Sequence, residues 1–113
     1  MNSTDSTVSV NSIVVLITAG SHEEARRIAD LLVGKNKAAC VNIVPGVDSI
    51  FHWKGKVESA RESLLPVKTR VALLSDVVRL VREIHSYELP EIIALPIIGG
   101  SEDYMRWLDT ATK

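Results

Sequence analysis

Residues 12–34 read SIVVLITAGSHEEARRIADLLVG, and this stretch decides the fold class. Its first eight residues are dense in β-branched side chains, which predicts a buried strand over Ser12–Ala19. Ser21 is a typical helix N-cap residue, and Glu24, three residues later, completes a capping box. The helix is expected to end near residues 34–37. Its apolar residues recur at helical spacing and predict a stripe that packs on the sheet: Ala25, Ile28, Ala29 and Leu32.

The next part of the chain predicts a long hairpin. Residues 38–53 have strand character that is broken at Pro45-Gly46, where a bulge or bend is expected. Lys54-Gly55 predicts a turn into a third strand over residues 56–69. Pro66 lies inside that strand and cannot donate a ladder hydrogen bond, so an edge position or a local irregularity is expected there.

The last third of the chain predicts a helix over residues 73–85, a strand over 92–96, and a final helix capped by Ser101. The order βαββαβ with a C-terminal helix indicates an α+β fold, a ferredoxin-like sandwich whose antiparallel sheet carries helices on one face. The other face is open and its strands are apolar in places. Self-association through that face or through the long hairpin is therefore expected.

Composition limits the function. The chain has 113 residues, which is the size of one domain, and we assign residues 12–113 to it and residues 1–11 to a flexible N-terminal leader. The leader lacks the basic start and apolar stretch of a signal peptide, which predicts a cytoplasmic protein. A net charge of -1 without a basic block disfavours nucleic-acid binding, and no apolar run is long enough to cross a membrane.

No catalytic apparatus is recognisable in the sequence, so an enzyme is not expected. There is no glycine-rich phosphate loop and no nucleophile that the sequence places beside a base. The single cysteine, Cys40, excludes an intrachain disulfide and a metal site built from several cysteines.

Several blocks of sequence resemble the CutA divalent-cation tolerance family, in the family order from about residue 12 to residue 109. They are AACVNIVPG at 38–46, Ser49-Ile50, WKGK at 53–56, Glu58, Lys68-Thr69, HSYELPEII at 85–93, LPI at 95–97, Gly100, Tyr104, Trp107 and Leu108. The resemblance implies a ferredoxin-like subunit in a homotrimer similar in architecture to the PII signalling proteins. It also implies a cytoplasmic protein of copper and divalent-cation tolerance without an established enzymatic activity.

The resemblance also bears on a metal site. The ligands proposed for the family are a cysteine just after the first strand and two histidines before the Tyr-x-x-Pro-Glu block. This chain has Thr18-Ala19-Gly20 at the first position and Ile84-His85 at the second, so His85 is the ligand that carries over. Glu88 and Glu91 add oxygen donors for Cu(II) or Zn(II). In the alternative reading, His85 ends a helix, where a cation is mildly stabilising.

A second group of residues predicts a ligand cleft between subunits. It combines aromatic rings, a cationic side chain and acids that suit a small anion or metabolite: Trp53, Lys68, Tyr87, Glu88 and Glu91. Alternatively, Tyr87, Glu88 and Pro90 only shape the turn from the second helix into the last strand, and Glu91 pairs with Lys68 across strands.

Two functions follow as hypotheses. The first is a homotrimeric divalent-cation tolerance protein that binds copper or other divalent ions and contributes to metal-ion homeostasis. The second is a PII-like signalling or interaction module that binds a metabolite or a protein partner in a cleft between subunits.

Overall fold

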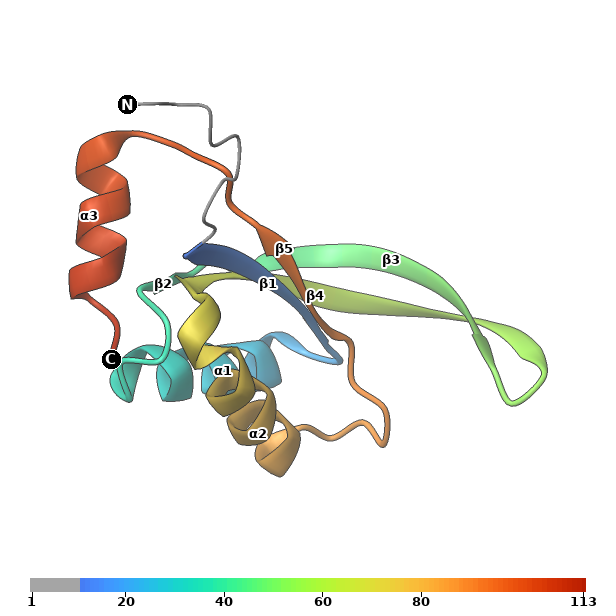
Figure 1. Ribbon diagram of the computed structural model, residues 1–113. Coiled ribbons are helices and arrows are strands. Elements are labelled where there is room, and N and C mark those ends of the chain that lie inside the picture. The colour runs from blue at the N-terminus through green and yellow to red at the C-terminus, as the bar shows by residue number, and fades with distance from the viewer. Residues whose placement is uncertain (1–10) are drawn as a thin grey trace.

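The computed structural model describes residues 11–113, and its sheet and helices form the α+β fold that the sequence predicts (Figure 1). Residues 1–10, most of the expected leader, lie outside the described residues, whereas the backbone oxygen of Asn11 accepts a bond from Val71. The elements are β1 (Ser12–Ala19), α1 (His22–Gly34), β2 (Cys40–Val41), β3 (Val44–Trp53), β4 (Lys56–Arg70), a short 3₁₀ turn (Val71–Leu73), α2 (Leu74–Ile84), β5 (Ile92–Pro96) and α3 (Glu102–Thr110).

The sheet has the order β2-β4-β1-β5, with β3 following β2 along the same edge of β4, and all its pairs are antiparallel. This is the ferredoxin-like arrangement that the element order predicts. Figure 1 shows α1 and α2 together on one face of the sheet, and α3 at the end away from the hairpin tip. No helix within residues 11–113 is long and apolar enough to cross a membrane.

The core lies between the sheet and helices α1 and α2. Its β1 residues alternate along the strand as a half-buried strand requires, and the predicted stripe of α1 is buried against them. The buried side chains of this layer include Ile13, Val15, Ile17, Ala25, Ile28, Ala29, Leu32, Leu65, Val67, Val77 and Val81. The intervening residues of the strands form the opposite face, which neither α1 nor α2 covers.

The expected irregularities are both present in the β2–β3 edge. The register of β3 on β4 shifts between Val44 and Val47, so Pro45 and the positive-φ Gly46 form a bulge. Pro66 lies within β4, and its carbonyl accepts a bond from Asn42, in the gap between β2 and β3. Backbone N and O of one residue point to the same neighbour in an antiparallel strand. The nitrogen of Pro66, which has no hydrogen to donate, therefore points to the gap between β2 and β3, where the hydrogen-bond ladder is interrupted.

The β3–β4 hairpin extends beyond the rest of the molecule. Lys54 and Gly55 both have positive φ, at 51° and 79°, as a two-residue type I′ turn requires. Trp53 and Lys56 close the turn as the last cross-strand pair. The molecule measures 54 × 31 × 23 Å, and Figure 1 shows that the hairpin accounts for its long dimension. The part of this hairpin from residue 49 to the turn forms one wall of the candidate site.

Candidate functional site

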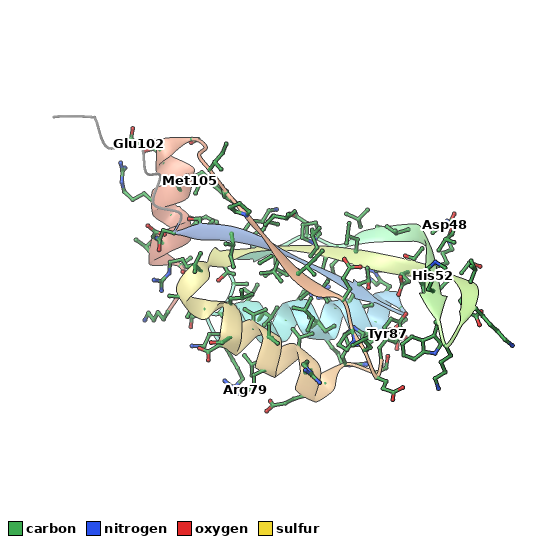
Figure 2. The ribbon with its side chains drawn as sticks, turned by 45° about the vertical axis from the view of Figure 1, so that its right-hand side comes forward. Asp48, His52, Arg79, Tyr87, Glu102 and Met105 are labelled. Atoms are coloured by element: carbon green, nitrogen blue, oxygen red, sulfur yellow. The ribbon has the colours of Figure 1, made fainter. Side chains whose placement is uncertain are left out.

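A cleft of about 970 Å³ lies between the β3–β4 hairpin and the segment that joins α2 to β5. Figure 2 shows Tyr87, from this segment, beside the hairpin that carries Asp48 and His52. The lining residues come from β1, from both hairpin strands and from the connecting segment: Thr18, Ser49, Ile50, Phe51, His52, Trp53, Glu58, Ser59, Ala60, Glu62, Ser86, Tyr87, Glu88, Leu89, Pro90 and Glu91.

The hairpin wall is built by strand register. Phe51 lies opposite Glu58 and Ser49 lies opposite Ala60, so alternate residues of both strands share one face. Trp53 follows on that face at the tip, where the ammonium of Lys54 lies 5.7 Å from its ring centroid. The wall thus presents aromatic rings next to a carboxylate.

Tyr87 holds the other wall against the sheet. Its hydroxyl donates a 2.6 Å hydrogen bond to Oε2 of Glu62, and Glu62 is only 7% exposed. Burial and the hydrogen bond to the Glu62 carboxylate raise the pKa of Tyr87 to about 12. A Cβ atom at Gly20 would lie 3.1 Å from the Tyr87 hydroxyl, so the glycine lets the ring approach the end of β1.

Glu24 fixes the start of the same segment. Its carboxylate accepts bonds from the Ser86 backbone N–H (2.7 Å), the Ser86 hydroxyl (3.0 Å) and the Gly20 N–H (3.2 Å). Burial by itself raises the pKa of Glu24, but these hydrogen bonds lower it by more, so the net shift of the pKa is downward. One of the two hydrogen bonds of the predicted capping box is present, because Ser21 Oγ accepts from the Glu24 N–H at 3.1 Å. The Glu24 carboxylate does not return to the Ser21 N–H and instead accepts from Gly20 and Ser86.

His85 is the C-cap residue of α2, which is the position that the alternative reading gives it, and its side chain is fully buried. Nε2 lies 2.8 Å from the Thr18 carbonyl oxygen, which can only accept, so this nitrogen carries the proton. Nδ1 accepts a 3.0 Å bond from the Tyr87 N–H and lies 3.6 Å from Oε2 of Glu24. A neutral ring with its hydrogen on Nε2 satisfies both hydrogen bonds. Its only in-plane lone pair, on Nδ1, accepts the bond from the Tyr87 N–H and is not free to bind a metal ion.

The donor set therefore does not fit a copper or zinc centre at His85. Transition-metal sites need three or four convergent ligands. Within residues 11–113 no group of three His, Cys, Asp or Glu side chains is placed to hold a metal ion. A metal role for His85 requires the ring to give up one of its hydrogen bonds, and this role stays a prediction.

The structure brings together four of the five predicted cleft residues. Trp53, Tyr87, Glu88 and Glu91 line the cleft, and Lys68 does not. Lys68 pairs with Cys40 across the strands and donates a hydrogen bond to Asn42. It lies six residues along β4 from Glu62, the nearest residue of that strand in the cleft lining, which is about 20 Å of extended strand. The cation that suggested a small anion as ligand is therefore absent from the cleft of one chain.

Sequence reasoning missed Glu62 and the second role of Glu24. Glu24 was assigned to the cap alone, and no local pattern indicates that its carboxylate also reaches Ser86, 62 residues away. Glu62 lies in the long predicted strand just before its apolar run. A charged residue at that position is expected to have an exposed side chain. Its burial depends on Tyr87, which the chain supplies 25 residues later.

Relatives of this chain are known from several organisms. It is 46% identical over 109 residues to "Protein CutA, chloroplastic" of Arabidopsis thaliana, a match that covers 96% of this chain. It is 50% identical over 95 residues to the "Divalent-cation tolerance protein CutA" of Thermus thermophilus, which covers 84% of this chain and 92% of that protein. The chain spans only about 60% of the length of the curated plant relatives that it matches.

The fold is shared with solved structures of the same name. The crystal structure of CutA1 from Oryza sativa superimposes with a TM-score of 0.89 at 44% sequence identity, covering 95% of this chain and 98% of that one. The model of the CutA1 divalent ion tolerance protein family matches residues 13–111. The chain belongs to the CutA1 divalent ion tolerance protein family.

Proposed function

We propose that this chain contributes to divalent-cation tolerance as a homotrimer. It binds copper and other divalent cations weakly through exposed carboxylates and not through a buried metal site at His85. Family membership supports the tolerance role. The observation that carries the metal part is the hydrogen bonding of His85, whose two ring nitrogens are both engaged inside the fold. Contacts to exposed carboxylates are weak because water competes for the ions.

The open face of the sheet supports the trimer. Register places Leu16 beside Pro66 and Ile93, and Val14 beside Leu95, on the face opposite the helices. Ile93 and Leu95 are 53% and 48% exposed in one chain. Contiguous apolar surface of this kind is typical of an interface between subunits. The proposed partners are thus further copies of this chain and divalent cations, with neither nucleic acid nor a membrane.

The metal part is tested by calorimetric titration of Cu(II) and Zn(II) into the native chain, His85→Ala and, as a matched control, the exposed His22→Ala. Circular dichroism first establishes that each variant is folded. We expect weak heats that are alike in native protein and His85→Ala. A stoichiometric site that survives in His22→Ala and disappears in His85→Ala would overturn this proposal and make His85 a ligand.

A second candidate function is a signalling or interaction module that binds a small metabolite in the cleft beside Tyr87. The cleft volume of about 970 Å³ and its aromatic lining favour it, because small-molecule sites are concave and mostly apolar. Thermal shift with a metabolite library tests the module, since a ligand selective for the folded state raises its melting temperature.

The cytoplasm remains the proposed location, although the Arabidopsis thaliana relative is named chloroplastic.

A further inference from the structure

The residues that line the cleft carry a net negative charge, and the nearest cation that the contacts give is the ammonium of Lys54, 5.7 Å from the ring of Trp53 at the hairpin tip. The cleft lining contains Glu58, Glu62, Glu88 and Glu91 but neither lysine nor arginine. Within the described residues, none of these four carboxylates takes part in an ion pair, whereas Asp30, Asp48 and Asp76 elsewhere all do. Four acids that form no ion pair within the described residues therefore line a single hollow that also carries aromatic rings.

Glu62 is the most telling of the four because it is buried. It is 7% exposed, and Oε2 accepts the hydroxyl of Tyr87 at 2.6 Å. Oε1 has no hydrogen-bond partner within residues 11–113, and it is open to the cleft, because no fully buried side-chain oxygen of these residues lacks a partner. A carboxylate that is mostly buried and has no cation beside it has lost part of its solvation. A positive group in the cleft would meet this oxygen at little further cost in desolvation.

The rings in the cleft also suit a cation. Phe51, Trp53 and Tyr87 line it, and the Trp53 ring already lies 5.7 Å from the ammonium of Lys54. Aromatic faces attract ammonium and guanidinium groups through their quadrupole. Ile50, Leu89 and Pro90 complete an apolar lining that suits the carbon skeleton of a ligand rather than a hydrated ion.

A bare metal ion fits these observations less well. A divalent cation needs several ligands that converge on one point, and within residues 11–113 no three such side chains do. The carboxylates are instead distributed over both walls of a hollow of about 970 Å³, a volume within the range of small-molecule sites.

We propose that the cleft binds a small organic cation, with an ammonium or guanidinium group against Glu62 and its carbon skeleton against Phe51, Trp53 and Tyr87, while Glu58 adds negative charge farther along the same wall. This inference rests on the metabolite-binding candidate function and names its ligand class. It reverses the expectation of an anion, because Lys68 lies outside the cleft lining.

The test uses phenethylammonium as the probe and Trp53 fluorescence as the signal. The chain has two tryptophans, so Trp107→Phe leaves Trp53 as the only one. We expect a saturable change in Trp53 fluorescence with phenethylammonium and none with its neutral analogue 2-phenylethanol or with the anion phenylacetate.

Glu62→Gln is expected to weaken binding of phenethylammonium about tenfold or more, as loss of a charged hydrogen-bond partner does. Glu58→Gln keeps the Tyr87–Glu62 bond and is expected to weaken binding in the same direction. Glu23→Gln makes the same charge change on exposed α1 surface and is expected to leave the affinity unchanged.

Three results would overturn the proposal. One is the absence of saturation with phenethylammonium, and another is equal affinity for 2-phenylethanol. The third is a change in Trp53 fluorescence with Zn(II) that is lost in Glu62→Gln, together with no change on addition of phenethylammonium. The ligand would then be a metal ion. Light scattering on the same samples reports the trimer separately. A trimer without amine binding thus refutes the ligand class alone, and a monomer that binds the amine refutes the trimer alone.

Discussion

Glu24 links three parts of the chain through one buried carboxylate. Its hydrogen bonds to Gly20 and Ser86 join the end of β1, the start of α1 and the segment after α2. His85 and Tyr87 continue the network to Thr18 and Glu62. These side chains act together as a clamp that holds one wall of the cleft in place. The conformation of residues 85–91 therefore depends on contacts distant in sequence.

Substitution of Glu24 tests this clamp. Glu24→Gln turns one acceptor oxygen into a donor that faces N–H groups, and we expect it to lower the free energy of unfolding by about 1–3 kcal/mol. Glu23→Gln, its exposed neighbour, is the matched control and is expected to change stability little. Urea unfolding of the two variants measures the difference.

The pH dependence of the same variant has a definite sign. The pKa of Glu24 is lowered in the folded chain from its ordinary value of 4.5. Its stabilising contribution is therefore fully present above that value and lost as the pH falls through the folded pKa. The gap in stability between native protein and Glu24→Gln is expected to narrow below about pH 4.5. A gap that stays constant into acid would contradict the assigned role of the charge.

Tyr87 provides a spectroscopic test of the other end of the clamp. Its pKa is raised from 10.0 to about 12, so its contribution to stability is complete below pH 10 and lost between there and about pH 12. In Tyr104→Phe, Tyr87 is the only tyrosine, and the phenolate absorbance is expected to appear near pH 12. Adding Glu62→Gln to this background is expected to lower that midpoint. Ionisation near pH 10 in both would place Tyr87 outside the network.

At the scale of elements, local signals in the sequence were sufficient for most of the fold. The β-branched run of β1, the apolar stripe of α1 and the Lys54-Gly55 turn each predicted the observed structure, because each depends on nearby residues alone. The strand predicted over residues 38–53 divides into β2 and β3 at residues 42–43, opposite Pro66, which has no N–H to donate, whereas at Pro45-Gly46 β3 continues through the predicted bulge. The position of a cross-strand partner is not a local property.

Two glycines test how local backbone chemistry sets these elements. Gly55 has a φ of +79° in the hairpin turn, so Gly55→Ala is expected to destabilise the chain by about 1 kcal/mol. Gly34 ends α1 with open space around it, and Gly34→Ala is expected to stabilise the chain by up to about 1 kcal/mol. Thermal unfolding of both variants gives opposite shifts if the turn geometry is correct, and parallel shifts if it is not.

At the scale of the whole molecule, the sequence was a weaker guide to the site than to the fold. It predicted Trp53, Tyr87, Glu88 and Glu91 as cleft residues, and they meet there because the hairpin and the α2–β5 segment are adjacent in space. It also included Lys68 as the cationic member of the group, and the register of β4 places this residue outside the cleft lining. The buried Glu62 and the engaged ring of His85 depend on tertiary contacts that sequence spacing does not encode.

The open sheet face makes the trimer the central claim at this scale. Ile93 is 53% exposed on that face, and Ile93→Lys would bury a charge in the interface while costing the single chain little. Val33→Lys makes the same kind of change on α1, away from the face, where Val33 is 43% exposed. The first variant is expected to dissociate and the second to assemble as the native chain does.

The most direct measurement is the molar mass of the native chain and these two variants by size-exclusion chromatography with light scattering. We expect the native chain and Val33→Lys to have three times the 12.4 kDa mass of one chain, and Ile93→Lys to have a mass near 12.4 kDa. A native chain with the mass of a monomer, or an Ile93→Lys variant that remains a trimer, would contradict assembly through the open face of the sheet.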